Sequence, residues 1–383
     1  MNSLRETIDA SPRIRRLMAE HAATGAAQLP MPLAPARWDW ETVRRVLLIR
    51  LRSIGDTVLT TPSLFALRRF LPHAQIDILL EDWVAPVLAG SSDVDNIITF
   101  QRGSKRDRLQ ASRAIRKTRY DVVFNLHGGT TATLMTRASG ARHRVGFGHY
   151  QYRHLHNHLA PPSPQLWGHD KLHSVEQQLA LLGWTGVPVS DRPPTRLAVT
   201  EDAAKKVSQY LREAGVAENR PFAVIHPAAS YATKQWATEK FARVAEELVA
   251  RGIAPVAIAA AHEAEIVSAL VQEARSPVAG LNNLSLPEVT ALTSRARLFV
   301  GNDSGIAHIA AAAGAPAVVI FGSSSVTHWR PWSSQANEVV REELPCQPCH
   351  GYFCAEFEQP ECIVRVPVER VVGAMDRVLR ESA

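Results

Sequence analysis

One segment, residues 297–321, narrows the possible folds more than any other; its sequence is RLFVGNDSGIAHIAAAAGAPAVVIF. A hydrophobic run ends in Asn302-Asp303-Ser304-Gly305, an alanine-rich stretch follows, and a second hydrophobic run closes the segment. This order predicts a strand, a tight loop, a helix and a strand, the unit of an open parallel sheet. The loop would place backbone N–H groups at a helix N-terminus, where the helix dipole favours an anion such as a nucleotide diphosphate. An ordinary strand–helix–strand unit, which needs only a turn and small side chains, would have the same pattern.

Apolar runs and amphipathic stretches alternate in two parts of the chain, which predicts an α/β protein with a doubly wound parallel sheet in each half. Strands are expected at 45–51, 74–80, 96–100, 120–126, 222–226 and 254–259, and a loop at Ser53–Asp56. The proline-containing stretch Val187–Arg196 is expected to link two Rossmann-like domains, 41–190 and 191–383, that face a central cleft. Residues 1–40 are predicted to be a helical or partly disordered extension, with the ordered fold beginning near Arg44.

Length and composition agree with two globular domains. The chain has 383 residues, of which 46% are hydrophobic and 21% charged, as in soluble globular proteins. No apolar stretch of 18 or more residues looks capable of spanning a bilayer. The N-terminus has arginines but no apolar core of the signal-peptide kind, so we expect a cytoplasmic protein.

The formal net charge is +6, and the basic residues are concentrated between Gln101 and Tyr120. Only Asp107 opposes the eight basic residues there: Arg102, Lys105, Arg106, Arg108, Arg113, Arg116, Lys117 and Arg119. Such a surface suits nucleic acid, anionic lipid headgroups or a charged glycan; a solvated helix face is the simpler alternative. Because no nucleic-acid-binding module is present, nucleic acid is the least favoured partner.

Two further loops hold residues that could carry chemistry. The loop from Arg52 to Asp56 follows the first strand and is not a dinucleotide fingerprint, since it has one glycine. Asp56 could cap the helix that follows, or it could act as a general base toward a hydroxyl nucleophile. Lys234 follows the loop after strand 222–226 and could neutralise a diphosphate; taken alone, it would be an ordinary surface lysine.

Three segments taken together resemble glycosyltransferase family 9, the ADP-heptose:lipopolysaccharide heptosyltransferases. They are RLRSIGDTVLTTPSLFALRRFLP, HPAASYATKQWATEKFARVAEEL and GNDSGIAHIAAAAGAPAVVIFG. The resemblance runs from about Arg45 to about Val372. It implies the GT-B fold, with the acceptor in the N-terminal domain and the nucleotide in the C-terminal one. It also implies inverting heptosyl transfer from an ADP-sugar to a lipopolysaccharide core or related anionic glycolipid, at the inner face of the cytoplasmic membrane and without a metal cofactor.

The resemblance assigns roles residue by residue. Asp56 matches the catalytic base, which would take the proton of the attacking acceptor hydroxyl while Lys234 and the N–H groups after Asp303 stabilise the departing diphosphate. A water-exposed aspartate, with a pKa of about 3.9, would be a fully ionised but weak base. The predicted donor-site residues are Ser230, Lys234, Glu263 (with Glu265 as its alternative), Asp303, Ser304, Gly305 and His308, and the predicted acceptor-site residues are Arg52, Thr60 and Thr61.

All four cysteines, Cys346, Cys349, Cys354 and Cys362, lie within one segment, the Cys-rich loop 346–362. Four thiols so close together suggest a structural zinc or iron site, whereas a disulfide is disfavoured in a reducing compartment. Reduced thiols that pack a loop are the alternative. Similar clusters occur in many but not all members of the family, so we expect no catalytic role. The only Asp-x-Asp, at Asp93 and Asp95, is expected to be a turn.

Two other functions share this architecture. A sugar-nucleotide epimerase would show a richer set of acids and histidines at its site. A non-catalytic sugar-nucleotide or glycan-binding protein would keep Lys234 and Asp303 but would not need Asp56. The residues themselves identify neither the donor base nor the sugar, so ADP-heptose is an expectation from the resemblance.

Overall fold

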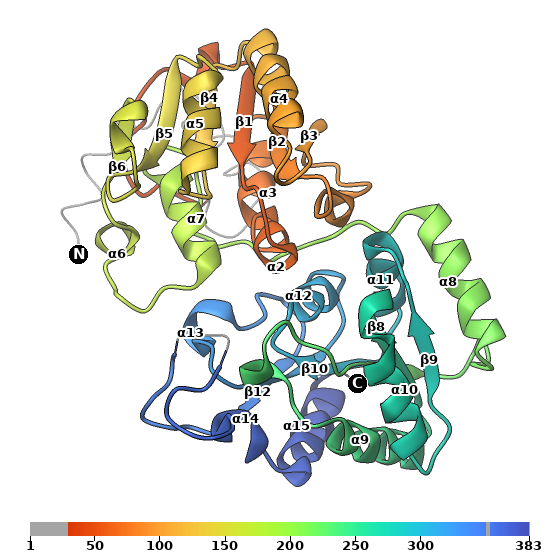
Figure 1. Ribbon diagram of the computed structural model, residues 1–383. Coiled ribbons are helices and arrows are strands. Elements are labelled where there is room, and N and C mark those ends of the chain that lie inside the picture. Colours follow the sequence, from red (N-terminus) through yellow and green to blue (C-terminus); the bar gives the residue numbers. More distant parts are fainter. Residues whose placement is uncertain (1–29, 350–352, 383) are drawn as a thin grey trace, which may run out of the picture. The chain divides into compact units, whose positions relative to one another are not determined.

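The computed structural model describes residues 30–349 and 353–382. These residues form two compact units, shown in Figure 1. Unit 1 comprises the described residues up to Ala85 together with Ser91–Pro193, and unit 2 comprises Pro86–Gly90 and the residues from Pro194 onward. Each unit is built on one six-stranded sheet.

The sheet of unit 1 is entirely parallel. Its strands are β1 (Arg45–Ile49), β2 (Gln75–Glu81), β3 (Asn96–Phe100), β4 (Val122–Asn125), β5 (His143–Phe147) and β6 (His158–Ala160). They lie in the order β3-β2-β1-β4-β5-β6, so β1 pairs with β2 on one side and β4 on the other. This is the doubly wound order of dinucleotide-binding domains, in which ligands bind beyond the carboxyl ends of the strands where the order reverses. In unit 1 that switch point lies between β1 and β4.

Helices cover both faces of this sheet, which explains its continuous apolar strands. They are α2 (Ile54–Val58), α3 (Thr61–Phe70), α4 (Lys105–Thr118), α5 (Thr130–Ala138), α6 (Ser163–Trp167) and α7 (Ser174–Gly183), with short 3₁₀ turns η1 (Trp40–Thr42), η2 (Ala85–Leu88, at the boundary with unit 2) and η3 (Arg153–Leu155). Leu47 and Ile49 of β1 pack with Ile115 of α4 and Met135 of α5. Helices α3 and α7 contact each other and the sheet.

Unit 2 repeats this plan. Its strands are β7 (Phe222–His226), β8 (Ala254–Ala259), β9 (Ala279–Asn282), β10 (Leu298–Asn302), β11 (Ala317–Phe321) and β12 (Asn337–Arg341). The order β12-β11-β10-β7-β8-β9 is again parallel throughout. Counted within the unit, it is the same order as in unit 1, and the switch point lies between β7 and β10. The α/β class predicted from the alternation is confirmed, as are two Rossmann-like sheets.

Helices also flank the second sheet. They are α8 (Glu201–Glu213), α9 (Thr238–Ala250), α10 (Ala264–Glu273), α11 (Leu286–Thr293), α12 (Gly305–Ala312), α13 (Val326–Trp329), α14 (Glu361–Val364) and α15 (Val368–Glu381), with 3₁₀ turns η4 (Ala232–Lys234) and η5 (Ala261–Glu263). Apolar side chains of α9, α10 and α15 form one core with the sheet. Helix α11 packs against α8 and α12. No described helix is long and apolar enough to cross a membrane.

Two expectations about local structure are wrong. The ordered fold begins before Arg44, because Trp40 is 1% exposed and its indole N–H donates to the Thr185 carbonyl at 2.8 Å. Residues 1–29 of the predicted extension lie outside the described residues. The loop expected at Ser53–Asp56 is largely the first turn of helix α2, with Ser53 at its N-cap. Four residues were too few to show helical periodicity in the sequence.

Candidate active site

The switch point of unit 1 holds the predicted base. Asp56 lies in the first turn of α2 and forms an ion pair with Arg50, the residue that follows β1. Its other carboxylate oxygen accepts hydrogen bonds from the backbone N–H and the hydroxyl of Ser53, each at 3.1 Å. Ser53 is the N-cap of α2, and Asp56, the third residue of the helix, stabilises the helix start by accepting hydrogen bonds from Ser53.

The carboxyl group of Asp56 is not the water-exposed acid that the sequence suggested. Burial alone would raise its pKa, but the Arg50 charge and the hydrogen bonds from Ser53 and Arg50 outweigh burial and hold the pKa below its ordinary value. Asp56 is consequently ionised at neutral pH and held in a fixed orientation. Such a carboxylate is suited to positioning a hydroxyl as well as to receiving its proton.

Arg50 connects the two strands at this switch point. Besides pairing with Asp56, its guanidinium donates to the carbonyl of Leu126, directly after β4, at 2.5 Å. The next residue, His127, is partly buried. Burial and the neighbouring Arg50 and Arg52 charges lower the pKa of His127 to about 4, although Asp56 acts in the opposite direction. His127 is therefore neutral at physiological pH and can donate or accept a hydrogen bond.

The three predicted acceptor-site residues have different surroundings. Arg52 is partly exposed, pairs with Glu81 at 3.8 Å and lines a cavity of about 350 Å³ within unit 1. Thr60 and Thr61 are buried, at 0% and 2% exposure. Thr60 donates to the Gln178 side chain at 2.7 Å, and Thr61 donates to the Val58 carbonyl at 2.8 Å. Both hydroxyls therefore help to hold α3 in place. The acceptor role of Arg52, Thr60 and Thr61 remains a prediction.

In unit 2, the switch point brings the predicted lysine and aspartate together. Lys234 ends the 3₁₀ turn η4 after β7, and Asp303 directly follows β10; Nζ and Oδ2 lie 2.8 Å apart. Asp303 is 6% exposed, so this carboxylate fixes the lysine from the protein side. An ammonium group has three N–H donors, so Lys234 can keep Asp303 and still bind an anion.

Helix α12 begins at this same point. Ser304 is its N-cap, and the Ser304 hydroxyl accepts a hydrogen bond from the N–H of Ala307 at 3.4 Å. The first N–H groups of α12, starting with Gly305, have no carbonyl partner inside the helix and create a positive potential for an anion. Lys234 and this helix N-terminus are both held at the switch point, through Asp303 and Ser304 respectively.

Asn302 was not among the site residues predicted from the sequence. Its side chain is fully buried, donates to the carbonyl of Pro227 at 2.8 Å and accepts from the N–H of Trp236 at 3.1 Å. Pro227 follows β7, and Trp236 lies two residues after Lys234. Asn302 thus fastens both ends of the Lys234 loop to the end of β10. A polar residue that closes an apolar strand, as in LFVGN, is the signal that could have identified it.

His226, the last residue of β7, is a second buried polar group at this edge. Burial lowers its pKa to about 4, so the ring is neutral, and its Nδ1 lies 3.3 Å from the Ser304 hydroxyl. The ring therefore supports the residue that caps α12. Its sequence signal is the same as that of Asn302, because FAVIH also ends an apolar strand in a polar side chain.

The other predicted donor residues lie around the same sheet edge. Ser230 is exposed in the loop after β7, and Glu263 is partly exposed at the end of η5, after β8. The Glu263 carboxylate accepts a long hydrogen bond from the Ala260 N–H, at 3.4 Å. Glu265 is exposed in α10. His308 is buried within α12, with 6% of its surface exposed. The roles of these residues remain predictions.

The loop after β11 contacts the lysine loop and the first part of the cysteine loop. The N–H and hydroxyl of Ser323 bond to the carbonyl and hydroxyl of Thr233, at 3.2 and 3.0 Å. From the other side, the N–H of Cys349 donates to the Ser323 carbonyl at 3.0 Å, and the Gln347 side chain donates to the Gly322 carbonyl at 2.6 Å. Ser323 therefore links the start of the Cys-rich loop, at Cys349, to Thr233, the residue before Lys234.

The four cysteines are free thiols. Cys346, Cys349 and Cys354 are partly buried and Cys362 is buried. Burial and the charges of the other three thiols raise the pKa of Cys362 to about 11. Within the described residues, no three histidine, cysteine or acidic side chains are placed to hold a metal ion. Asp93 and Asp95 lie in the turn before β3, and Asp95 pairs with Arg68 at 2.5 Å.

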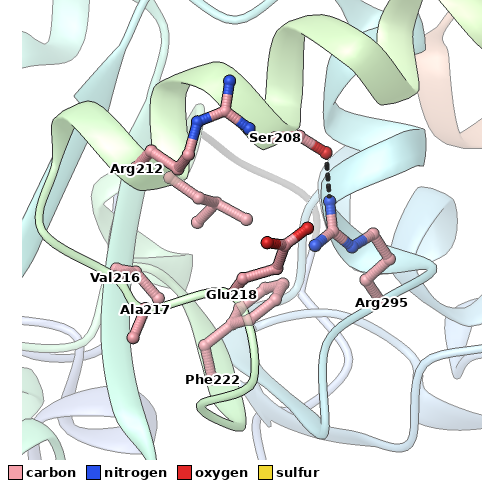
Figure 2. A pocket seen from close by; sticks show the side chains of 8 residues that line it. Ser208, Arg212, Val216, Ala217, Glu218, Phe222 and Arg295 are labelled. Atoms are coloured by element: carbon pink, nitrogen blue, oxygen red, sulfur yellow. Dashed lines mark hydrogen bonds between the residues drawn. The ribbon is translucent and has the colours of Figure 1, made fainter.

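A small hollow in unit 2 lies away from these groups. Figure 2 shows it between the end of α8 and the start of β7, with the Arg295 guanidinium donating to the Ser208 hydroxyl at 2.9 Å. Its volume of about 10 Å³ is room for about one water molecule. Because Phe222 begins β7, the hollow is at the amino end of the strand, whereas Lys234 and Asp303 lie beyond the carboxyl ends.

The sequence of residues 108–358 matches the profile of glycosyltransferase family 9 (heptosyltransferase). The chain belongs to this family. The match covers more than half of the chain and includes the lysine loop, the Asp303 loop and helix α4 from Arg108 onward. The protein is therefore a glycosyltransferase, which favours the transferase over the epimerase and the non-catalytic binding protein.

Individual relatives support this assignment. Lipopolysaccharide heptosyltransferase 3 of Escherichia coli K12 is 29% identical over 350 residues, which are 87% of this chain and 97% of that protein. A glycosyltransferase family 9 structure from Veillonella parvula aligns with a TM-score of 0.76 at 19% identity, covering 88% of this chain and 97% of the other. The E. coli ADP-heptose LPS heptosyltransferase II aligns with a TM-score of 0.71 at 22% identity, covering 88% and 100%. The two structures establish that the glycosyltransferase has the fold of these relatives, the predicted GT-B type.

Proposed function

We propose that this family 9 glycosyltransferase moves a heptose from an ADP-sugar to a lipopolysaccharide core or a related anionic glycan, with inversion at the anomeric carbon. The observation that carries the proposal is the chemistry at the two switch points. One holds a fixed, ionised carboxylate, and the other holds a lysine beside a helix N-terminus. These are the groups that a hydroxyl nucleophile and a departing diphosphate need. The names of the relatives support heptose and lipopolysaccharide.

The donor belongs to unit 2 in this proposal. Lys234 and the first N–H groups of α12 would bind the two phosphates, because Lys234 is cationic and held by the buried Asp303, and the helix N-terminus is positively polarised and capped by Ser304. Ser230 and Glu263, on the neighbouring loops, are assigned to the phosphate and sugar portions. As the glycosidic bond breaks, negative charge grows on the diphosphate, and these same groups stabilise it. We assign no step to a divalent metal.

The acceptor belongs to unit 1. Its hydroxyl attacks the anomeric carbon from the face opposite the nucleotide, and Asp56 receives the proton. The lowered pKa of Asp56 makes it a weak base, so a large part of its effect is to orient the hydroxyl until the C–O bond has formed and the oxygen has become acidic. We place the enzyme in the cytoplasm, at the inner membrane surface, where the basic residues of α4 would meet anionic lipid.

The cysteine loop is assigned a structural role. We infer that its four thiols hold the chain beside the loop after β11, either as reduced thiols or around a zinc or iron ion. Metal analysis of protein purified without chelator decides between the two: about one metal per chain, lost on substitution of Cys346 and Cys349 by serine, supports a bound ion.

A transfer assay tests the function. The purified protein is incubated with ADP-heptose and a heptose-deficient core oligosaccharide, and the acceptor is analysed by mass spectrometry for one added heptose. Asp56→Asn should reduce transfer by about 10²–10⁴-fold while ADP affinity stays the same. Asp191→Asn, which alters an exposed aspartate–arginine pair in the same unit, is the matched control. Parallel loss of transfer and ADP binding in Asp56→Asn would refute its role as the base.

A further inference from the structure

A cavity of about 350 Å³ lies beyond the carboxyl ends of the central strands of unit 1. Its lining comes from the residues after β1, the ends of β2 and β3, and the segment after β4. It is lined by Leu51, Arg52, Glu81, Phe100, Arg102, Gly103, Arg108, His127, Gly129, Thr130 and Thr131. This volume suits a small ligand or one sugar substituent. Arg50, which pairs with Asp56, donates to the Leu126 carbonyl directly before His127, and Leu51 and Arg52 of the lining follow Arg50 in the chain, so the cavity lies close to the predicted base.

Positive charge dominates the lining. Arg52, Arg102 and Arg108 contribute three guanidinium groups, and among the described residues Arg102 and Arg108 have no carboxylate partner. The single carboxylate is that of Glu81, which is 4% exposed, lies 3.8 Å from Arg52 and accepts the indole N–H of Trp83 at 2.9 Å. Glu81 therefore orients Arg52 and offsets only one of the three positive charges.

The backbone adds to this potential. Helix α5 begins at Thr130 with Gly129 as its N-cap, and Gly129, Thr130 and Thr131 all line the cavity. The first N–H groups of a helix have no carbonyl partner within it, and its dipole places partial positive charge at this end. Three guanidinium groups and a helix N-terminus around one cavity are donors for an oxyanion, because guanidinium binds phosphate or carboxylate in a bidentate manner.

We propose that this cavity binds one anionic substituent of the acceptor, a phosphate monoester or a carboxylate, next to the hydroxyl that Asp56 activates. The proposal rests on the function proposed above, and it makes Arg102 and Arg108 determinants of acceptor specificity. The anion would anchor the sugar at a fixed distance from Asp56, so an acceptor without it would react slowly even though its hydroxyl is intact.

The test uses the full-length protein and three forms of one acceptor: a phosphorylated core oligosaccharide, the same compound after phosphatase treatment, and the same compound with its carboxyl groups reduced to alcohols. Arg102→Gln and Arg108→Gln should raise KM for the untreated acceptor about 10- to 100-fold and leave ADP affinity unchanged. Arg102 is exposed and Arg108 partly exposed, so neither change empties the core. Arg142→Gln, an exposed arginine of unit 1 outside the cavity, is the matched control.

The acceptor forms identify the anion. The treatment that removes the bound group should raise KM of the wild type by the same factor as the arginine substitutions do. It should raise KM of the arginine variants little further, because the treatment and the substitution remove the same interaction. Loss on phosphatase treatment identifies phosphate, and loss on reduction identifies carboxylate. If the arginine substitutions raised KM by the same factor for all three acceptor forms, the proposal would be overturned. An equal loss in Arg106→Gln, on the same helix but outside the cavity, would overturn it in favour of a diffuse basic surface.

Titration of each acceptor form without donor separates this proposal from the function. Anion- and arginine-dependent binding without any heptose transfer would support the cavity and refute the proposed function. Normal transfer by Arg102→Gln and Arg108→Gln on the untreated acceptor would leave the proposed function standing and refute the cavity's role.

Discussion

Arg50 and Asp56 form an ion pair at the carboxyl end of β1, and the same guanidinium donates to the Leu126 carbonyl after β4. Arg50 therefore couples the predicted base to both strands of the switch point in unit 1. The arrangement keeps the carboxylate ionised and limits its rotation. The ion pair also sets the pH range in which Asp56 is ionised, because the charge of Arg50 opposes the effect of burial on the pKa of the Asp56 carboxyl group.

The pH dependence follows from this balance. The pKa of Asp56 lies below its ordinary value of 3.8, so its contribution to folding is complete above that pH and is lost as the pH falls through the lowered value. Activity that depends on ionised Asp56 should follow the same limit. In Arg50→Gln the burial effect remains while the main opposing charge is removed, so the acid limb of kcat/KM should move to higher pH. Arg69→Gln, which breaks the Arg69–Asp191 pair, should not move it. An unshifted profile in Arg50→Gln would contradict the assignment.

Lys234 should govern donor affinity. Removing one hydrogen-bonding cation from a phosphate typically costs about 1.5–3 kcal/mol, so Lys234→Ala should weaken ADP binding about 10- to 150-fold. The variant should also unfold at lower temperature, since Asp303 is buried and loses its cation. Titration with ADP well below the unfolding temperature separates the two effects. Lys205→Ala, which removes an exposed lysine paired with Glu201, is the control and should bind ADP as the wild type does.

Asn302 should affect donor binding without contacting the donor. Asn302→Ala leaves the Pro227 carbonyl and the Trp236 N–H without their partner, at about 1–3 kcal/mol for each unpaired buried group. The Lys234 loop loses its attachment to β10, so ADP affinity should fall along with stability. Asn157→Ala is a close control, because Asn157 also makes two side-chain bonds to the backbone, but in unit 1. If both variants lost stability and neither lost ADP affinity, Asn302 would be only structural.

The fold class could be predicted because apolar strands and amphipathic helices alternate along most of the chain, as in the segment from β10 to β11. Strands β5 and β6, with only the 3₁₀ turn η3 between them, were not expected. The sequence also predicted that Asp303 and Lys234 each follow a strand, whereas the pairing of β7 with β10, which brings the two loops together, came from the structure. It could not show that Arg50 holds Asp56, because their pairing depends on the first turn of α2. Nor could it show that Thr60 and Thr61 face the interior, since threonines at a helix start serve both as exposed caps and as buried packing residues. The lining of the proposed acceptor cavity comes from four separate strand ends, which no local pattern relates.

Gly322 should be required for the geometry of the lysine loop. A Cβ at this position would lie 2.0 Å from the carbonyl oxygen of Thr233, which is backbone and cannot move aside alone. Gly322→Ala should therefore displace Thr233 and with it Lys234, lowering ADP affinity about 10-fold or more if the Lys234–phosphate contact is lost.

In the control variant Gly373→Ala, within α15, the new Cβ would have only a flexible arginine tip 3.5 Å away. That control should be as stable as the wild type or more so by about 0.5–1 kcal/mol. Because Ser323, the next residue, also bonds to Cys349, Gly322→Ala should alter the reactivity of the cysteine loop toward a thiol reagent. Unchanged ADP affinity and thiol reactivity in Gly322→Ala would show that the loop after β11 does not position the lysine.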